Sequence, residues 1–110
     1  MKTQQVILTI SILAMVDLSA RRFVGFDGNV CAAGTKALGV VEAGTEAGGV
    51  APANVNGIIL VEAGAAIPAG AEVQVDATGR AIPKAAGISN GYAWDAAVAA
   101  GDLIRIVRGI

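Results

Sequence analysis

The sequence predicts a small, single-domain, all-β protein, built as a barrel or sandwich, and two observations lead to this class. Seven or so short runs rich in Val, Ile and Leu recur at intervals of roughly ten residues, and glycine-containing turns separate them. No segment shows an amphipathic helical period of useful length. At most one short helix is expected, near the C-terminus, where Asp95 could cap an Ala-rich turn over residues 95–100.

The first 18 residues are expected to form an extended N-terminal arm or first strand, with the β-rich domain following over residues 19–110. Val6, Leu8, Ile10 and Ile12 alternate with a second set that is also partly apolar. A strand that is apolar on both faces needs cover on both, which one small domain seldom supplies. An arm that adds to the sheet edge of a neighbouring subunit would provide it. The alternative is an ordinary buried first strand.

The same segment has some features of a secretory signal, but we expect it to be retained. Thr9 and Ser11 interrupt the apolar run, and Asp17 stands just before the small residues that would form a cleavage site. The run is also too short and too polar for a membrane-spanning helix, which needs about 20 mostly apolar residues.

The remaining strands follow in order, each ended by a turn signal. Asp27, Gly28 and Asn29 end the strand predicted over residues 22–26. Gly79 suits the positive φ of a hairpin turn over residues 77–80. Pro83 cuts a return strand short. Residues 43–52 are Gly-rich and predict a loop or irregular hairpin. The predicted strands span residues 22–26, 37–42, 55–62, 72–76, 81–83, 88–93 and 103–107.

Charge and composition exclude two classes of partner and favour a third. The net charge is −1 and the eight Lys and Arg residues are scattered, so nucleic acid and anionic membranes are not predicted partners. Hydrophobic residues make up 55% of the chain, but many are Ala, and aromatics are only 4%. Such a core is modest for the entropy it must offset. We therefore expect part of the apolar surface to be buried against other chains.

No residue pattern predicts catalysis, a metal site, a cofactor or a small-molecule substrate. The chain has no His and one cysteine, Cys31, which excludes His-based triads and Cys-rich zinc sites. Its Gly-rich stretches are not followed by the Lys and Ser/Thr of a phosphate-binding loop. The acidic residues mostly flank turns, so a solvated role is favoured over paired-carboxylate chemistry. We predict that the protein is not an enzyme.

Three further residues are candidates for protein contacts. Arg21 and Arg22 form a local basic pair that would suit an acidic patch on a partner, with simple solvation as the alternative. Trp94 is the only Trp and lies beside Tyr92, and both residue types are enriched at interface hot spots. Core burial of Trp94 is the competing interpretation.

Several segments resemble the small capsid cement, or head decoration, proteins of bacteriophages. These are "LSARRFVGFDGNVCAAGTKALGVVEAGTEAGG", "NVNGIILVEAGAAI", "EAGAAIPAGAEVQVDATGRAIP" and the ending "AWDAAVAAGDLIRIVRGI". Together they cover most of residues 19–107. The resemblance implies a small β-rich fold similar to the β-tulip of lambdoid decoration proteins. It also implies a homotrimer that binds the major capsid protein at three-fold positions, on the outer surface of a virion head, after synthesis in the host cytoplasm. The family carries no catalytic residues.

Two other function classes stay open at this point. The rhythm of "AGAAIPAGAEV" is similar to the hairpins of biotinyl or lipoyl carrier barrels, which display a modified lysine. Lys36 and Lys84 are the nearest candidates, but neither has the sequence context of such carriers. A small hydrolase or lyase is the third class, and it would depend on a single essential acidic residue.

Overall fold

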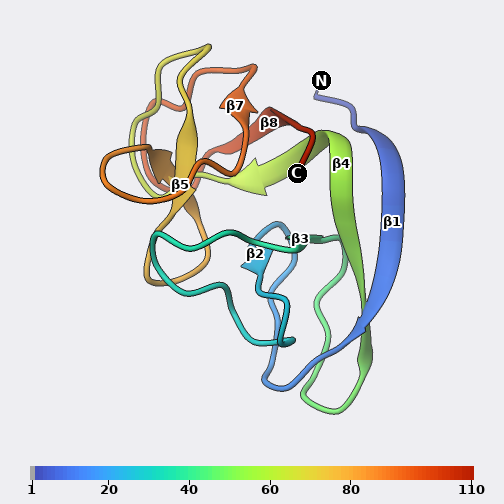
Figure 1. The fold of residues 1–110 in the computed structure, drawn as a ribbon. Helices are drawn as coiled ribbons and strands as arrows, with labels where there is room; N and C mark the ends of the chain where they lie inside the picture. The colour runs from blue at the N-terminus through green and yellow to red at the C-terminus, as the bar shows by residue number, and fades with distance from the viewer. Residues whose placement is uncertain (1) are drawn as a thin grey trace.

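The computed structural model describes residues 2–110, which form eight β-strands and no helix. Figure 1 shows the chain as a curled antiparallel sheet with a small hairpin beside it. The strands are β1 (Gln5–Leu13), β2 (Phe23–Val24), β3 (Gly39–Val41), β4 (Val50–Glu62), β5 (Val73–Val75), β6 (Ala81–Pro83), β7 (Tyr92–Ala93) and β8 (Leu103–Arg108). The prediction of an all-β fold is confirmed.

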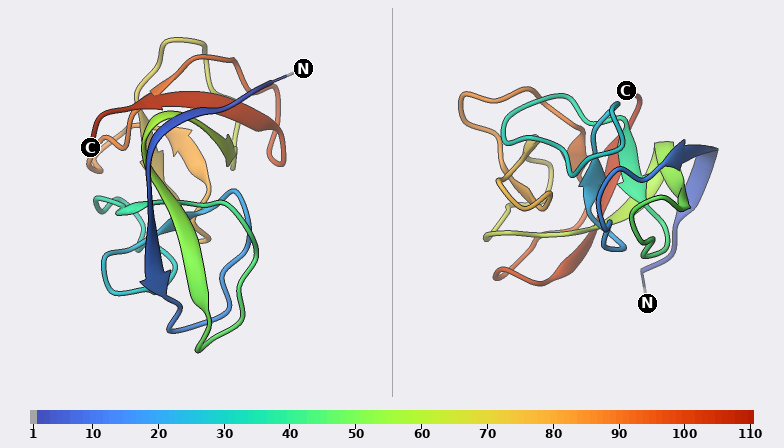
Figure 2. Two further views of the ribbon diagram at one scale, coloured as in Figure 1. Left: turned by 90° about the vertical axis from the view of Figure 1, so that its right-hand side faces the viewer. Right: turned by 90° about the horizontal axis from the view of Figure 1, so that it is seen from below.

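The long strand β4 organises the sheet. β1 pairs along one edge of β4, while β3 and then β8 pair along its other edge, and β2 and β7 extend the sheet from them. All of these strand pairs are antiparallel. The views in Figure 2 show how β1 and β4 bend together, so that the sheet wraps partly around the interior. β5 and β6 form the separate two-stranded sheet.

Strand β4 is five residues longer than predicted, because pairing overrides weak local preference. Residues 50–54 include Ala and Pro, which are poor strand formers, and residues 50–52 fall in the loop predicted over residues 43–52. Ala53 and Asn54 nevertheless pair with β1 on one side and with β3 on the other. Pro52 lies opposite Ser11, and its carbonyl accepts a hydrogen bond from the Glu42 amide at 2.9 Å.

The helical turn considered for residues 95–100 does not form. This stretch consists of bends and a turn, and Ala97 makes an isolated antiparallel bridge to Ile67. Asp102, which follows the stretch, accepts hydrogen bonds from the amides of Val98 and Ala99 at 2.8 and 3.2 Å. These tertiary contacts fix an irregular loop where Ala content favoured a helix. No helix among the described residues is long and apolar enough to cross a membrane.

Two clusters of buried side chains form the core. The larger one joins the C-terminal half of β4 and β8 to the β5–β6 hairpin, and Phe23 is its largest member. The smaller one lies under β1 and contains Val24 and Val41 with two alanines of β4. Burying one Val, Ile or Phe side chain contributes about 1.5–3 kcal/mol. Cys31 is buried in the larger cluster, and burial raises the pKa of its thiol.

Candidate protein-binding surfaces

The N-terminal segment is a strand of its own sheet and not a free arm. β1 pairs with β4 over residues 5–13, which is the first-strand form of the prediction for this segment. Val6 packs against the larger core cluster, and Ile10 and Ile12 pack against the smaller one. Three of the four predicted interface residues on this strand therefore contribute to their own domain. Leu8 is the exception, because it stays 44% exposed.

A β-bulge explains why Leu8 departs from the alternation. The register shifts between Val6 and Leu8, so Ile7 has no partner on β4, and it is 82% exposed. Gly57 allows β1 and β4 to lie close together at the bulge. Its φ is +113°, and a Cβ placed there would come within 2.5 Å of the Gln5 carbonyl oxygen. The bulge turns apolar groups of β1 outward, and the outer edge of β1 pairs with no other strand of residues 2–110.

A polar network ties the start of β1 to the rest of the sheet. Glu42 accepts hydrogen bonds from Gln4 at 2.9 Å and from Asn54 at 3.2 Å, and Asn54 accepts one from Thr9 at 2.9 Å. Burial alone would raise the pKa of Glu42, but these hydrogen bonds and the charge of Arg21 outweigh it and lower the pKa. The N-terminal segment is thus anchored by polar as well as apolar contacts.

Both candidate arginines are paired with carboxylates of their own chain. Arg21 Nη1 lies 2.8 Å from Glu42 Oε2, and Arg22 Nη2 lies 3.4 Å from Glu62 Oε2. Both side chains remain partly accessible, at 26% and 33% exposure. The acidic partner that the sequence assigned to another protein is therefore supplied internally, and contact with a second protein stays a prediction.

Trp94 lies at the surface, which favours the interface interpretation over core burial. It is 50% exposed, and the Arg105 guanidinium stacks over its ring at 4.5 Å from the centroid. Two nitrogens of Arg105 each lie 2.9 Å from an Asp95 oxygen. The hydrogen bonds from Arg105 lower the pKa of Asp95 to about 2. Asp95 thereby fixes Arg105, and Arg105 fixes the Trp94 ring in an exposed position.

Trp94 belongs to a larger apolar surface on the outer side of β7 and β8. Tyr92 pairs with Val107 across the two strands, and both are about half exposed. Because strand side chains alternate, Leu103 and Val107 share one side of β8. We call Tyr92, Trp94, Leu103 and Val107 the β7–β8 face. The sequence indicated only its aromatic members.

A second exposed apolar surface, which no sequence pattern predicted, lies at the opposite end of the sheet. Three connecting segments meet there, namely residues 13–18, 25–30 and 43–50, which we call the loop end. They gather at the lower end of Figure 1. Its exposed apolar side chains are Leu13, Met15, Val16, Phe26 and Val50. The sequence signal that could have predicted this surface is the occurrence of Met15, Val16 and Phe26 in turn segments, where apolar residues have no core to fill.

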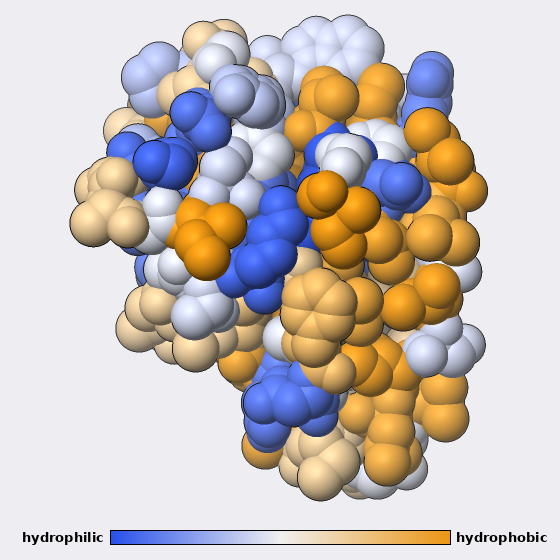
Figure 3. Space-filling view, viewed as in Figure 1, coloured by the Kyte–Doolittle hydropathy of each residue, from blue (hydrophilic) through white to orange (hydrophobic). Residues whose placement is uncertain are grey.

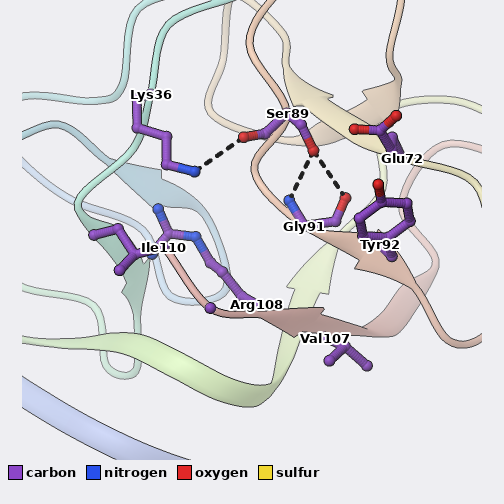
Figure 4. Close-up of a pocket in the computed structure, with 9 residues that line it drawn as sticks. Lys36, Glu72, Ser89, Gly91, Tyr92, Val107, Arg108 and Ile110 are labelled. Atoms are coloured by element: carbon purple, nitrogen blue, oxygen red, sulfur yellow. Dashed lines mark hydrogen bonds between the residues drawn. The ribbon is translucent and has the colours of Figure 1, made fainter.

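A pocket of about 230 Å³ lies beside β7 and β8, and its polar groups serve the fold. Figure 4 shows Lys36 and Arg108 on one side, with Glu72 and Tyr92 on the other. Lys36 donates a hydrogen bond to the Ser89 carbonyl at 3.1 Å. Burial, and then the charge of Arg108, lower the pKa of Lys36.

Arg108 acts as a buried cross-link between segments. Its guanidinium donates to the carbonyls of Ala37, Leu38 and Val55, and its Nη2 lies 3.4 Å from Asn90 Oδ1. The side chain is buried and has no carboxylate partner, so burial lowers its pKa to about 10. The pocket therefore borders a structural cation. Residues 2–110 contain no cluster of three or more acidic, Cys or His residues suited to a metal ion.

Comparison with known families shows which kind of protein carries these surfaces. The family model described as "Phage cement protein" matches residues 1–108, nearly the whole chain. The chain belongs to the phage cement protein family. Cement proteins are structural components of the phage head and not enzymes, in agreement with the sequence analysis.

A solved structure shares the fold of this cement protein. The crystal structure of the head fiber gp8.5 N base of bacteriophage phi29 superimposes with a TM-score of 0.76. The match covers 93% of each chain at 20% sequence identity, so it shows a common fold. A comparison with curated protein sequences finds no match.

Proposed function

We propose that this cement protein binds the outer surface of an expanded phage head, contacts the major capsid protein and stabilises the lattice. The observation that carries the proposal is membership of the cement family over residues 1–108. The surface supports it, because the described chain leaves fourteen large hydrophobic side chains exposed, several of them clustered. Contiguous apolar patches on a small soluble domain mark sites of protein interaction.

We further propose that the protein assembles as a homotrimer at three-fold positions of the head. A cyclic trimer uses two different patches of each subunit at every contact. The unpaired outer edge of β1 and the β7–β8 face supply two such patches, one offering backbone hydrogen bonds and the other aromatic contact. This assignment keeps the predicted role of the N-terminal segment at an interface, now as an edge strand.

The mechanism is mechanical. Each trimer would present three copies of its capsid-binding surface, so modest contacts act together and the effective concentration of the second and third contact is high. A trimer that bridges neighbouring capsid subunits must be released from all of them before they separate. Decoration therefore opposes outward pressure on the shell without any chemical step.

Purified expanded heads that lack this protein test the proposal. We expect added protein to bind them saturably and to raise the temperature at which they release their DNA, measured with a dye that is excluded from intact heads. Unexpanded heads, with a different lattice spacing, are the control and should bind less. Heads that bind the protein yet release DNA at an unchanged temperature would contradict the cementing role.

A further inference from the structure

We propose that the loop end is the surface that seats on the capsid, on a capsid-subunit site that is apolar at its centre and rimmed by Lys and Arg. This inference rests on the proposed function, and it names the contact face and the chemistry of the partner. Figure 3 shows apolar side chains running along the side of the molecule that carries β1 and down to its lower end.

The three segments of the loop end are held together as one rigid unit. Ala14 exchanges backbone hydrogen bonds with Gly49 and Gly48 at 2.9 and 2.8 Å, and the Met15 amide donates to the Gly28 carbonyl at 3.0 Å. Leu18 and Thr45 exchange two further bonds. A preorganised surface loses little conformational entropy when it binds.

The apolar groups of this unit are more exposed than folding requires. Phe26 is 61% exposed, Met15 57%, Val50 65% and Leu13 54%, and Leu13 lies directly opposite Val50 in the β1–β4 ladder. Single exposed hydrophobic residues are ordinary, but a group of them on one rigid unit is not. Phe26 supplies an aromatic anchor of the kind found at the centre of interfaces.

Charge distinguishes the loop end from the rest of the surface. Asp17, Asp27 and Glu46 lie in its three segments, and all eight Lys and Arg residues of the chain lie outside them. Asp17 accepts a hydrogen bond from the Ala47 amide at 2.9 Å and Asp27 accepts one from Asn29 at 3.0 Å, which fixes both carboxylates. Complementary potential across an interface then calls for a basic rim on the partner.

The same charges argue against a second copy of this chain as the occupant. Two loop ends facing each other would bring three carboxylates of one copy against three of the other, with no cation between them. Like charges placed together across an interface are unfavourable. A capsid subunit with basic residues around an apolar hollow has no such conflict. Because the β1 edge and the β7–β8 face already supply the two patches of the proposed trimer contact, we assign the loop end to the capsid contact.

Matched variants test the assignment on purified expanded heads that lack the protein. Phe26→Ser and Glu46→Lys alter the loop end, and Glu46 is exposed at a loop tip. The controls are Val98→Ser, an 84% exposed residue in a remote loop, and Lys84→Glu, which changes an exposed charge outside the three segments of the loop end. Urea unfolding midpoints confirm that each variant folds, and binding is measured by co-sedimentation over a range of salt concentrations.

We expect Phe26→Ser and Glu46→Lys each to bind heads at least tenfold more weakly, while both controls bind as wild type. Glu46→Lys should also bind with a weaker salt dependence, because rim charges act through long-range attraction. Loop-end variants that bind heads as wild type does would overturn the assignment of the loop end to the capsid contact and leave the proposed function standing. So would variants that change the trimer, by light scattering, and leave head binding intact. Wild-type protein that fails to bind heads would overturn the proposed function itself.

Discussion

Arg108→Met should lower the free energy of unfolding by about 3 kcal/mol, since a buried acceptor left without its donor costs about 1–3 kcal/mol. Three backbone carbonyls, those of Ala37, Leu38 and Val55, receive their hydrogen bonds from this guanidinium. Methionine fills much of the space but donates nothing. Part of the loss is offset, because the buried cation is itself costly, as its lowered pKa shows.

Arg105→Met is the matched control, because it makes the same substitution on the same strand. Arg105 pairs with Asp95 near the surface, and such pairs contribute about 0–1 kcal/mol. Urea denaturation of both variants followed by circular dichroism gives the comparison. Equal losses at the two positions would show that Arg108 is not a structural cross-link.

Gly57→Ala should be similarly damaging, with a loss of about 3 kcal/mol, combining about 1–2 kcal/mol for a left-handed backbone with about 1–3 kcal/mol for overpacking. The new methyl group would meet the Gln5 carbonyl oxygen at 2.5 Å and the Ile7 nitrogen at 2.7 Å. Both atoms are backbone, so β1 must move away from β4. The bulge that exposes Ile7 would be lost with it.

Gly70→Ala separates the clash from the backbone strain. Gly70 also has a positive φ, +84°, but a Cβ there would meet nothing within 4 Å. We expect this control to lose about 1 kcal/mol, from the backbone conformation alone. Hydrogen exchange should show loss of protection at β1 amides in Gly57→Ala only. Unchanged β1 protection in that variant would contradict the close approach of the two strands.

The fold class was predictable because its signals are local. Glycine turns and short β-branched runs locate most strands to within two or three residues, as for β5, β6 and β8. The N-terminal end of β4 was not predictable from local signals, since residues 50–54 are extended by pairing with two partner strands and not by their own preferences. The helical turn at residues 95–100 failed for the same reason, as the Ala97–Ile67 bridge competes with it.

The candidate surfaces were harder to predict than the fold. Trp94 was a candidate because aromatic residues are enriched at interfaces, and its contact with another protein stays a prediction. The exposure of Met15 and Phe26 depends on how three distant loops meet. For the N-terminal segment the sequence left open an arm on a neighbouring subunit and an ordinary first strand, and the structure pairs it with β4 of its own sheet. The contacts of Val6, Ile10 and Ile12 with the core show that this strand contributes to the packing of its own domain.

We propose that this cement protein holds an expanded phage head together from outside. Electron cryo-microscopy of expanded heads, reconstructed with and without the protein, tests it most directly. We predict added density on the outer surface at three-fold positions, three copies to each, with the loop end against the capsid. Identical reconstructions, or added density confined to the inner surface of the shell, would contradict the account.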